Sequence, residues 1–88
     1  MEINANNVIA LNNLAWIYGE DEADKALIAG EAAYNLASNR PEIMDTYGWF
    51  LYKNDRADEA VTVLKEAVKL APDNAEIAEH LKEAESAL

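Results

Sequence analysis

The chain has 88 residues, enough for one small domain, and 51% of them are hydrophobic while 27% are charged. This composition is typical of a folded domain rather than of a disordered segment. Acidic residues outnumber basic ones by 17 to 7, which gives a formal net charge of −10, and phosphate backbones or anionic lipid surfaces repel such a chain. We therefore expect no nucleic-acid partner, and because no apolar run approaches about 18 residues, no membrane insertion.

Five stretches carry the apolar spacing of amphipathic helices. Alanine is abundant and β-branched residues are few, which favours helix along almost the whole chain. Met44, Tyr47, Gly48 and Leu51 illustrate the i, i+3, i+4, i+7 pattern that forms one stripe on a helix. In chain order, the pattern predicts helices over about residues 7–19, 22–37, 41–53, 56–70 and 74–87.

Capping residues mark the helix starts. Asp21 and Asp55 are expected to cap the second and fourth helices, and Pro41 to stand at the start of the third. The capping-box spacing of Asp73-Asn74-Ala75-Glu76 predicts the start of the fifth. The connections are only a few residues long, so neighbouring helices must run antiparallel.

The predicted helices repeat in pairs. Residues 11–16 align with residues 44–49, which follow 33 positions later, and residues 24–26 align with residues 58–60, which follow 34 positions later. The one-residue difference places a deletion in the first inter-helix turn, around residues 19–22. A repeat of this length indicates stacked helical hairpins.

The repeating unit resembles the tetratricopeptide repeat. In the second unit the family's pattern is carried by Met44, Tyr47, Gly48, Leu51, Ala60, Leu64, Ala67 and Pro72. The first unit departs from it, with Gly30 in place of a large apolar residue and Ser38 in place of proline. The resemblance covers about residues 7–88 and implies an all-α fold, in which antiparallel helix-turn-helix repeats stack as a short right-handed α-solenoid of five helices.

The resemblance also implies the domain organisation. A single domain over residues 1–88 would contain repeat 1 at about 7–40, repeat 2 at 41–74 and a capping helix at 75–88. Lys82 occupies a small-residue position against which a following helix normally packs. We interpret the last helix as a solvated cap that ends the solenoid; the alternative is a chain cut out of a longer array.

Partner-binding residues follow from the family register, because the first helix of each pair lines the concave face. The expected set is Asn12, Asn13, Trp16, Asp45, Thr46, Trp49, Tyr52 and Lys53, to which the cap adds Glu76, Glu79, His80 and Glu83. In the second unit these residues lie off the apolar stripe, so periodicity independently predicts that they are exposed.

Trp16 and Trp49 are the main expected anchors. They occupy equivalent positions in the two units and should therefore stand side by side on adjacent helices. Partly exposed tryptophan is enriched at binding hot spots. The alternative is that the two rings pack together and serve the fold alone.

The acidic inner face favours a basic or aromatic partner segment. Asp45 and Trp49 stand where some family members use Lys and Asn to clamp a terminal carboxylate, so binding of that type is not expected. The alternative for the charge as a whole is that it keeps an alanine-rich helical protein soluble.

The residue types give little support for catalysis or for a cofactor. The chain has no cysteine, its only histidine is His80, and its three glycines are isolated, so thiolate chemistry and a phosphate-binding loop are excluded. His80 with Glu76 and Glu83 forms a conceivable metal site, but three ligands on one exposed helix rarely bind tightly. We expect no catalytic residue, no cofactor and no metal.

The sequence therefore predicts a non-enzymatic protein-interaction module that binds a peptide or protein segment on its concave face. The alternative is a structural, self-associating segment of a larger scaffold, with homodimers formed through open solenoid ends; a metal-binding or enzymatic domain is a remote third. The motif style resembles bacterial tetratricopeptide proteins of envelope and export systems. The absence of cysteine suits cytoplasm and periplasm equally, and the polar residues 1–7 do not resemble a signal peptide.

Overall fold

The computed structural model describes residues 5–88, so the expectation for the N-terminal segment, residues 1–7, lies mostly outside it. Within this range there are five α-helices and no strand. They are α1 (Ala5–Tyr18), α2 (Ala23–Leu36), α3 (Pro41–Lys53), α4 (Ala57–Leu70) and α5 (Ala75–Glu85), with a 3-10 turn, η1 (Glu20–Glu22), between α1 and α2. None of the described helices is long and apolar enough to cross a membrane.

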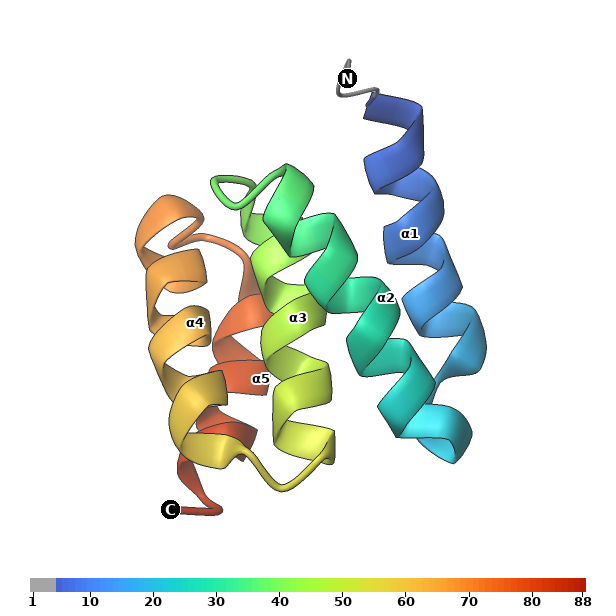
Figure 1. Cartoon of the computed structure of the whole chain (residues 1–88). Coiled ribbons are helices and arrows are strands. Elements are labelled where there is room, and N and C mark those ends of the chain that lie inside the picture. The colour runs from blue at the N-terminus through green and yellow to red at the C-terminus, as the bar shows by residue number, and fades with distance from the viewer. Residues whose placement is uncertain (1–4) are drawn as a thin grey trace.

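The helices stack as consecutive antiparallel pairs (Figure 1). Along the chain each helix packs against the next, and α3 also contacts both α1 and α5. The first helices of successive units, α1, α3 and α5, therefore form one row, while α2 and α4 lie in a second row. The predicted all-α fold of stacked helix pairs is confirmed, and each helix end lies within two residues of its predicted position.

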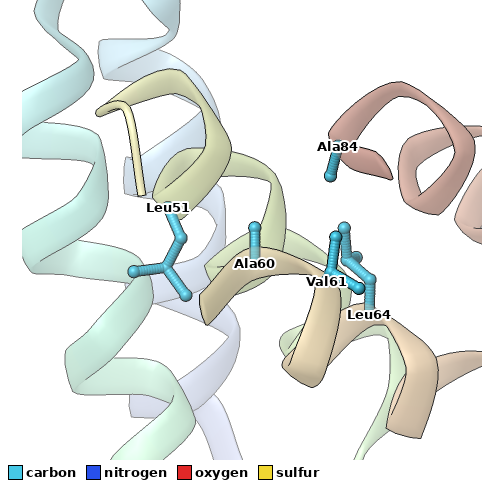
Figure 2. Packing of buried hydrophobic residues seen from close by; sticks show 5 residues of the cluster. All are labelled: Leu51, Ala60, Val61, Leu64 and Ala84. Atoms are coloured by element: carbon cyan, nitrogen blue, oxygen red, sulfur yellow. The ribbon is translucent and has the colours of Figure 1, made fainter. Parts of the chain in front are cut away.

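Small residues allow the close contact between α3, α4 and α5. Ala60 and Leu64 of α4 and Ala84 of α5 are fully buried in one cluster, and Figure 2 shows the Ala84 methyl directed toward α4. Gly48 of α3 sits directly against Leu64, because a Cβ at this position would lie 2.7 Å from Leu64 Cγ. A side chain at position 48 would hold the two helices apart.

Two of the predicted helix caps are wrong, and the turns explain why. Asp55 adopts a left-handed φ of 63°, and its N–H and that of Arg56 bond the carbonyls of Tyr52 and Leu51. This is the Schellman arrangement that closes a helix C-terminus, so Asp55 ends α3 instead of starting α4. Asp21 lies inside η1, because the shortened turn moves the start of α2 to Ala23.

Asn74 caps α5, one residue later than the start that the predicted capping box at Asp73 implied: its side-chain oxygen accepts a hydrogen bond from the Ile77 N–H at 3.1 Å. Asn54 has a tertiary role that the sequence pattern did not reveal. Its amide donates to the carbonyl oxygens of Phe50 at 2.7 Å and of Ala23 at 2.9 Å. These bonds tie the end of α3 to the start of α2 and fix the second helix pair on the first.

Candidate protein-binding face

The row formed by α1, α3 and α5 presents a continuous surface, which we call the inner face. Its side chains, half-buried or exposed, are Asn12, Asn13, Trp16, Trp49, Tyr52, Lys53, Glu76, Glu79, His80 and Glu83. Because α3 contacts both α1 and α5, residues at equivalent helical positions are brought together from distant parts of the chain.

A hydrogen bond between a partly buried histidine and a buried aspartate holds α5 on α3. His80 Nδ1 lies 2.7 Å from Asp45 Oδ1, and the Asp45 residue is only 4% exposed. The hydrogen bond to Asp45 raises the pKa of His80 above its ordinary value, with further support from the charges of Asp45, Glu76 and Glu79, while burial acts in the opposite direction. The Asp45 carboxylate therefore favours the protonated form of His80.

Trp49 lies at the centre of the inner face. Its ring stacks on the His80 ring with centroids 4.3 Å apart, and Tyr52 packs against it at 5.3 Å with the ring planes tilted by 51°. The Tyr52 hydroxyl donates to Glu83 Oε2 at 3.3 Å. Side chains of α3 and α5 thus form a joint aromatic and acidic surface.

Trp16 connects α1 to α3. Its indole Nε1–H donates to Thr46 Oγ1 at 2.9 Å, and its ring packs on the buried Phe50 at 4.9 Å. Trp16 nevertheless remains 40% exposed and lies 6.4 Å from the His80 ring. One edge of this tryptophan therefore packs in the protein and stabilises the fold, while another part is exposed to solvent.

Lys53 lies over the aromatic pair beside it. Its ammonium is 4.7 Å from the Trp49 ring centroid and 5.2 Å from that of Tyr52, both within the range of a cation–π interaction. The same ammonium pairs with Glu20 Oε1 at 2.6 Å. Hydrogen bonding to Glu20 is the main cause that raises the pKa of Lys53 above its ordinary value.

The structure places the expected binding residues unequally. Asp45 and Thr46 are 4% and 1% exposed, so the periodicity prediction of exposure is wrong for both. Trp16 covers Thr46 and His80 covers Asp45, because neighbouring units add cover that a single-helix pattern does not contain. Asn13 is exposed. Asn12 is half-buried, and its Oδ1 is enclosed without a hydrogen-bond partner among the described residues.

Sequence reasoning did not foresee the contacts that build this face. Asp45 and His80 are 35 positions apart, and no local pattern pairs them. Glu20 stands in the shortened turn, where no family position could be assigned to it. His80 itself was placed on the inner face by the family register, which was the only signal available.

The structure also changes which residues could together bind a metal ion. Ligand atoms of Asp45, Glu76 and His80 lie within 4.8 Å of one another, so Asp45 takes the place expected for Glu83. An imidazole with two carboxylates is a donor set that transition metals accept. A metal ion at this place would have to displace the hydrogen bond between Asp45 and His80, so the expected absence of a metal stays a prediction.

Stacked antiparallel helix pairs with a shared row of first helices define an α-helical repeat protein. The tetratricopeptide repeat family matches residues 41–84, which is half of the chain, so the chain belongs to this family. Tetratricopeptide repeats generally mediate protein–protein interactions and are generally not enzymes.

A curated relative supports the same assignment. The chain is 34% identical over 83 residues to the TPR repeat-containing protein PA4667 of Pseudomonas aeruginosa. The match covers 88% of this chain but only 13% of that relative. The similarity therefore concerns the repeat unit and not the activity of the whole relative.

Proposed function

We propose that this chain is a non-enzymatic module that binds a peptide or protein segment on its inner face. We treat it as one domain over residues 1–88, with repeats at about 7–40 and 41–74 and a capping helix at 75–88. The observation that carries the proposal is the partly exposed aromatic surface of Trp16, Trp49 and Tyr52, which three separate helices hold in place. Rigid, partly exposed aromatic rings give large contact areas at a small cost in entropy.

Within this face, the expected residues divide into two roles. Asp45 and Thr46 are buried and act as positioning residues, since they hold His80 and Trp16 by hydrogen bonds of 2.7 and 2.9 Å. Trp49, Tyr52 and Lys53 are the surface that a bound segment would contact. Asn12 and Asn13 extend this surface along α1.

The charge of the inner face favours a basic partner. Glu20, Glu76, Glu79 and Glu83 surround the aromatic surface and are all exposed, whereas Lys53 and His80 are already paired with acidic groups of the chain. The net charge of −10 adds a long-range attraction for cationic segments. This attraction raises the association rate in particular and weakens as salt is added.

Selection from a random-peptide library tests the proposal. Peptides that bind the wild-type chain are re-measured by calorimetry against Glu79→Lys, on the inner face of α5, and against the matched control Glu66→Lys, on the exposed surface of α4. We expect Glu79→Lys to weaken binding at least several-fold and Glu66→Lys to have little effect. Equal losses in the two variants, or selected peptides that bind elsewhere, would contradict the proposal.

A specific observation favours self-association as a second function. Helix α1 contains no charged residue, although the chain as a whole is strongly acidic, and Ile9, Ile17 and Ile28 are 46%, 77% and 71% exposed. Beside them is an open, mostly apolar hollow whose lining includes Leu14, Ala29 and, as its one charged residue, Lys25. Two copies with the same net negative charge repel each other least when they meet through this apolar surface, which carries no acidic residue in the lining of its hollow, so its occupant would be a second copy of the chain.

Light scattering across a range of concentrations tests this second function. It predicts a dimer that Ile17→Glu converts to a monomer. The control variant Leu70→Glu places the same charge on a leucine that is 53% exposed on α4 and should leave the dimer intact. A monomeric wild-type chain at every concentration would rule out self-association.

A further inference from the structure

The environment of Lys53 points to the chemistry of the bound segment. We propose that Trp49 and Tyr52, with Glu20 and Glu83 beside them, form a site for an arginine side chain of the partner, and that Lys53 occupies this site when no partner is bound. This inference rests on the proposed function and names the group that the inner face recognises.

The aromatic geometry supports recognition of a cation. The rings of Trp49 and Tyr52 lie 5.3 Å apart and are tilted by 51° to each other, so they form two walls around one position. The Lys53 ammonium already lies within 4.7 and 5.2 Å of the two ring centroids. A cation is therefore stable at this position, and Lys53 supplies one in the free protein.

The acidic residues at the edges of this site supply the matching charge. Glu20 pairs with the Lys53 ammonium at 2.6 Å, and its side chain is 62% exposed. Glu83 accepts the hydrogen bond of the Tyr52 hydroxyl and is also exposed. Both carboxylates have further lone pairs for an incoming donor.

Arginine fits this site better than lysine. Its planar guanidinium can stack on the Trp49 ring while its five N–H donors reach toward carboxylates at both edges. An ammonium is a compact, strongly hydrated charge and cannot do both as well. Since Lys53 is held mainly by a partly exposed ion pair with Glu20 and by cation–π contacts, the interactions lost on its displacement are modest.

Lys53 should therefore act as a built-in competitor. The probe is the peptide acetyl-Gly-Arg-Gly-amide, titrated while the indole N–H signal of Trp49 is followed by NMR. Replacing Lys53 by alanine should tighten binding of this probe by roughly three- to tenfold, the range expected for removal of one exposed ion pair with its aromatic contacts.

Two matched controls separate this effect from a change in net charge. Lys25→Ala removes the same charge and a similar set of contacts, because Lys25 pairs with Glu22 at 3.3 Å and lies 5.9 Å from the Tyr18 ring centroid. It should leave the affinity for the probe unchanged. In a second control, citrulline replaces arginine in the probe, which keeps its shape but removes its charge, and Lys53→Ala should give this peptide no advantage.

The outcomes distinguish this inference from the proposed function. If Lys53→Ala binds the arginine probe no more tightly than the wild type does, or if Lys25→Ala gains equally, the arginine site is wrong. Library-selected peptides that still bind the inner face would then leave the proposed function standing. Circular dichroism of each variant confirms that it is folded, so that a change in affinity is not a change in stability.

Discussion

His80 on α5 and Asp45 on α3 form a hydrogen-bonded pair at 2.7 Å, and this pair couples the last helix to the centre of the inner face. The His80 ring also stacks on Trp49. Helix α5 thus does more than pack against its neighbours, because its histidine also fixes the orientation of the central tryptophan. The groups facing the imidazole from α3 and α5 include Asp45, Glu76 and Glu79.

Stability should depend on the charge of His80. Its pKa is raised in the folded protein, so the folded state holds the proton more tightly than the unfolded chain does. The resulting stabilisation is fully present below the ordinary histidine pKa of about 6.5 and is lost as the pH rises through the higher folded value. Urea unfolding between about pH 6 and pH 9 measures the free energy of unfolding of both proteins. The difference between wild type and His80→Gln should become smaller as the pH rises.

Asp45→Asn provides the control for this pH dependence. It removes the carboxylate that is the main cause of the raised pKa of His80. In the Asp45→Asn background, the loss of stability caused by His80→Gln should therefore vary much less with pH. If the difference in free energy of unfolding between wild type and His80→Gln is constant or grows with pH, the Asp45 and His80 pair does not stabilise the folded state as an ion pair.

The hydrogen bond between Trp16 and Thr46 should contribute measurably to the contact between α1 and α3. Thr46→Val keeps the side-chain shape but removes the acceptor of the indole N–H, and the loss should be about 1 kcal/mol. Much of this loss should disappear in the Trp16→Phe background, which lacks the donor. Chemical denaturation of the two single variants and the double variant gives the coupling energy, and a value near zero would show that the bond contributes nothing.

Gly48 should be required by its contact with Leu64. In Gly48→Ala the new methyl would lie 2.7 Å from Leu64 Cγ, and overpacking should outweigh the gain in helix propensity, giving a net loss of about 1–2 kcal/mol. Gly30→Ala is the matched control, because its methyl would meet its nearest atoms at 3.6 Å. That variant should gain up to about 1 kcal/mol. Equal effects at the two positions in thermal unfolding would refute the packing argument.

The turn after α3 should become more stable with glycine at position 55. Asp55 has a φ of 63°, a conformation that costs glycine little, so Asp55→Gly should add about 0.5–1 kcal/mol to the free energy of unfolding. Asp55→Ala removes the same charge but keeps a Cβ, which is unfavourable at this φ. If Ala and Gly give the same gain in the free energy of unfolding by denaturant, relief of charge repulsion explains it and the backbone argument is wrong.

The fold was readable from the sequence because its signals are local and repeated. The stripe on α3 from Met44 to Leu51 and its counterpart one unit earlier defined both the helices and their stacking. The start of α5 was readable to within one residue from the local capping-box spacing, although Asn74 and not Asp73 makes the cap. The role of Asp55 was not, because aspartate is common at helix starts and its positive φ is set by the closure of the preceding helix.

The inner face was only partly predictable. The family register named Trp16, Trp49 and His80, but periodicity on one helix cannot show what a neighbouring helix covers. Thr46 and Asp45 therefore counted as exposed although tertiary contacts bury them. Ion pairs between neighbouring helix pairs, such as Lys53 with Glu20, depend on the packing of distant segments. The spacing of residues in the sequence does not predict them.

The most direct test of the central claim uses the two tryptophans as reporters. The chain contains two Trp residues, so an NMR spectrum has two indole N–H signals, which Trp16→Phe assigns. On titration with a library-selected peptide, we expect the Trp49 signal to move together with the backbone amides of α3 and α5. Shifts confined to the outer surfaces of α2 and α4, with both indole signals unchanged, would contradict binding at the inner face.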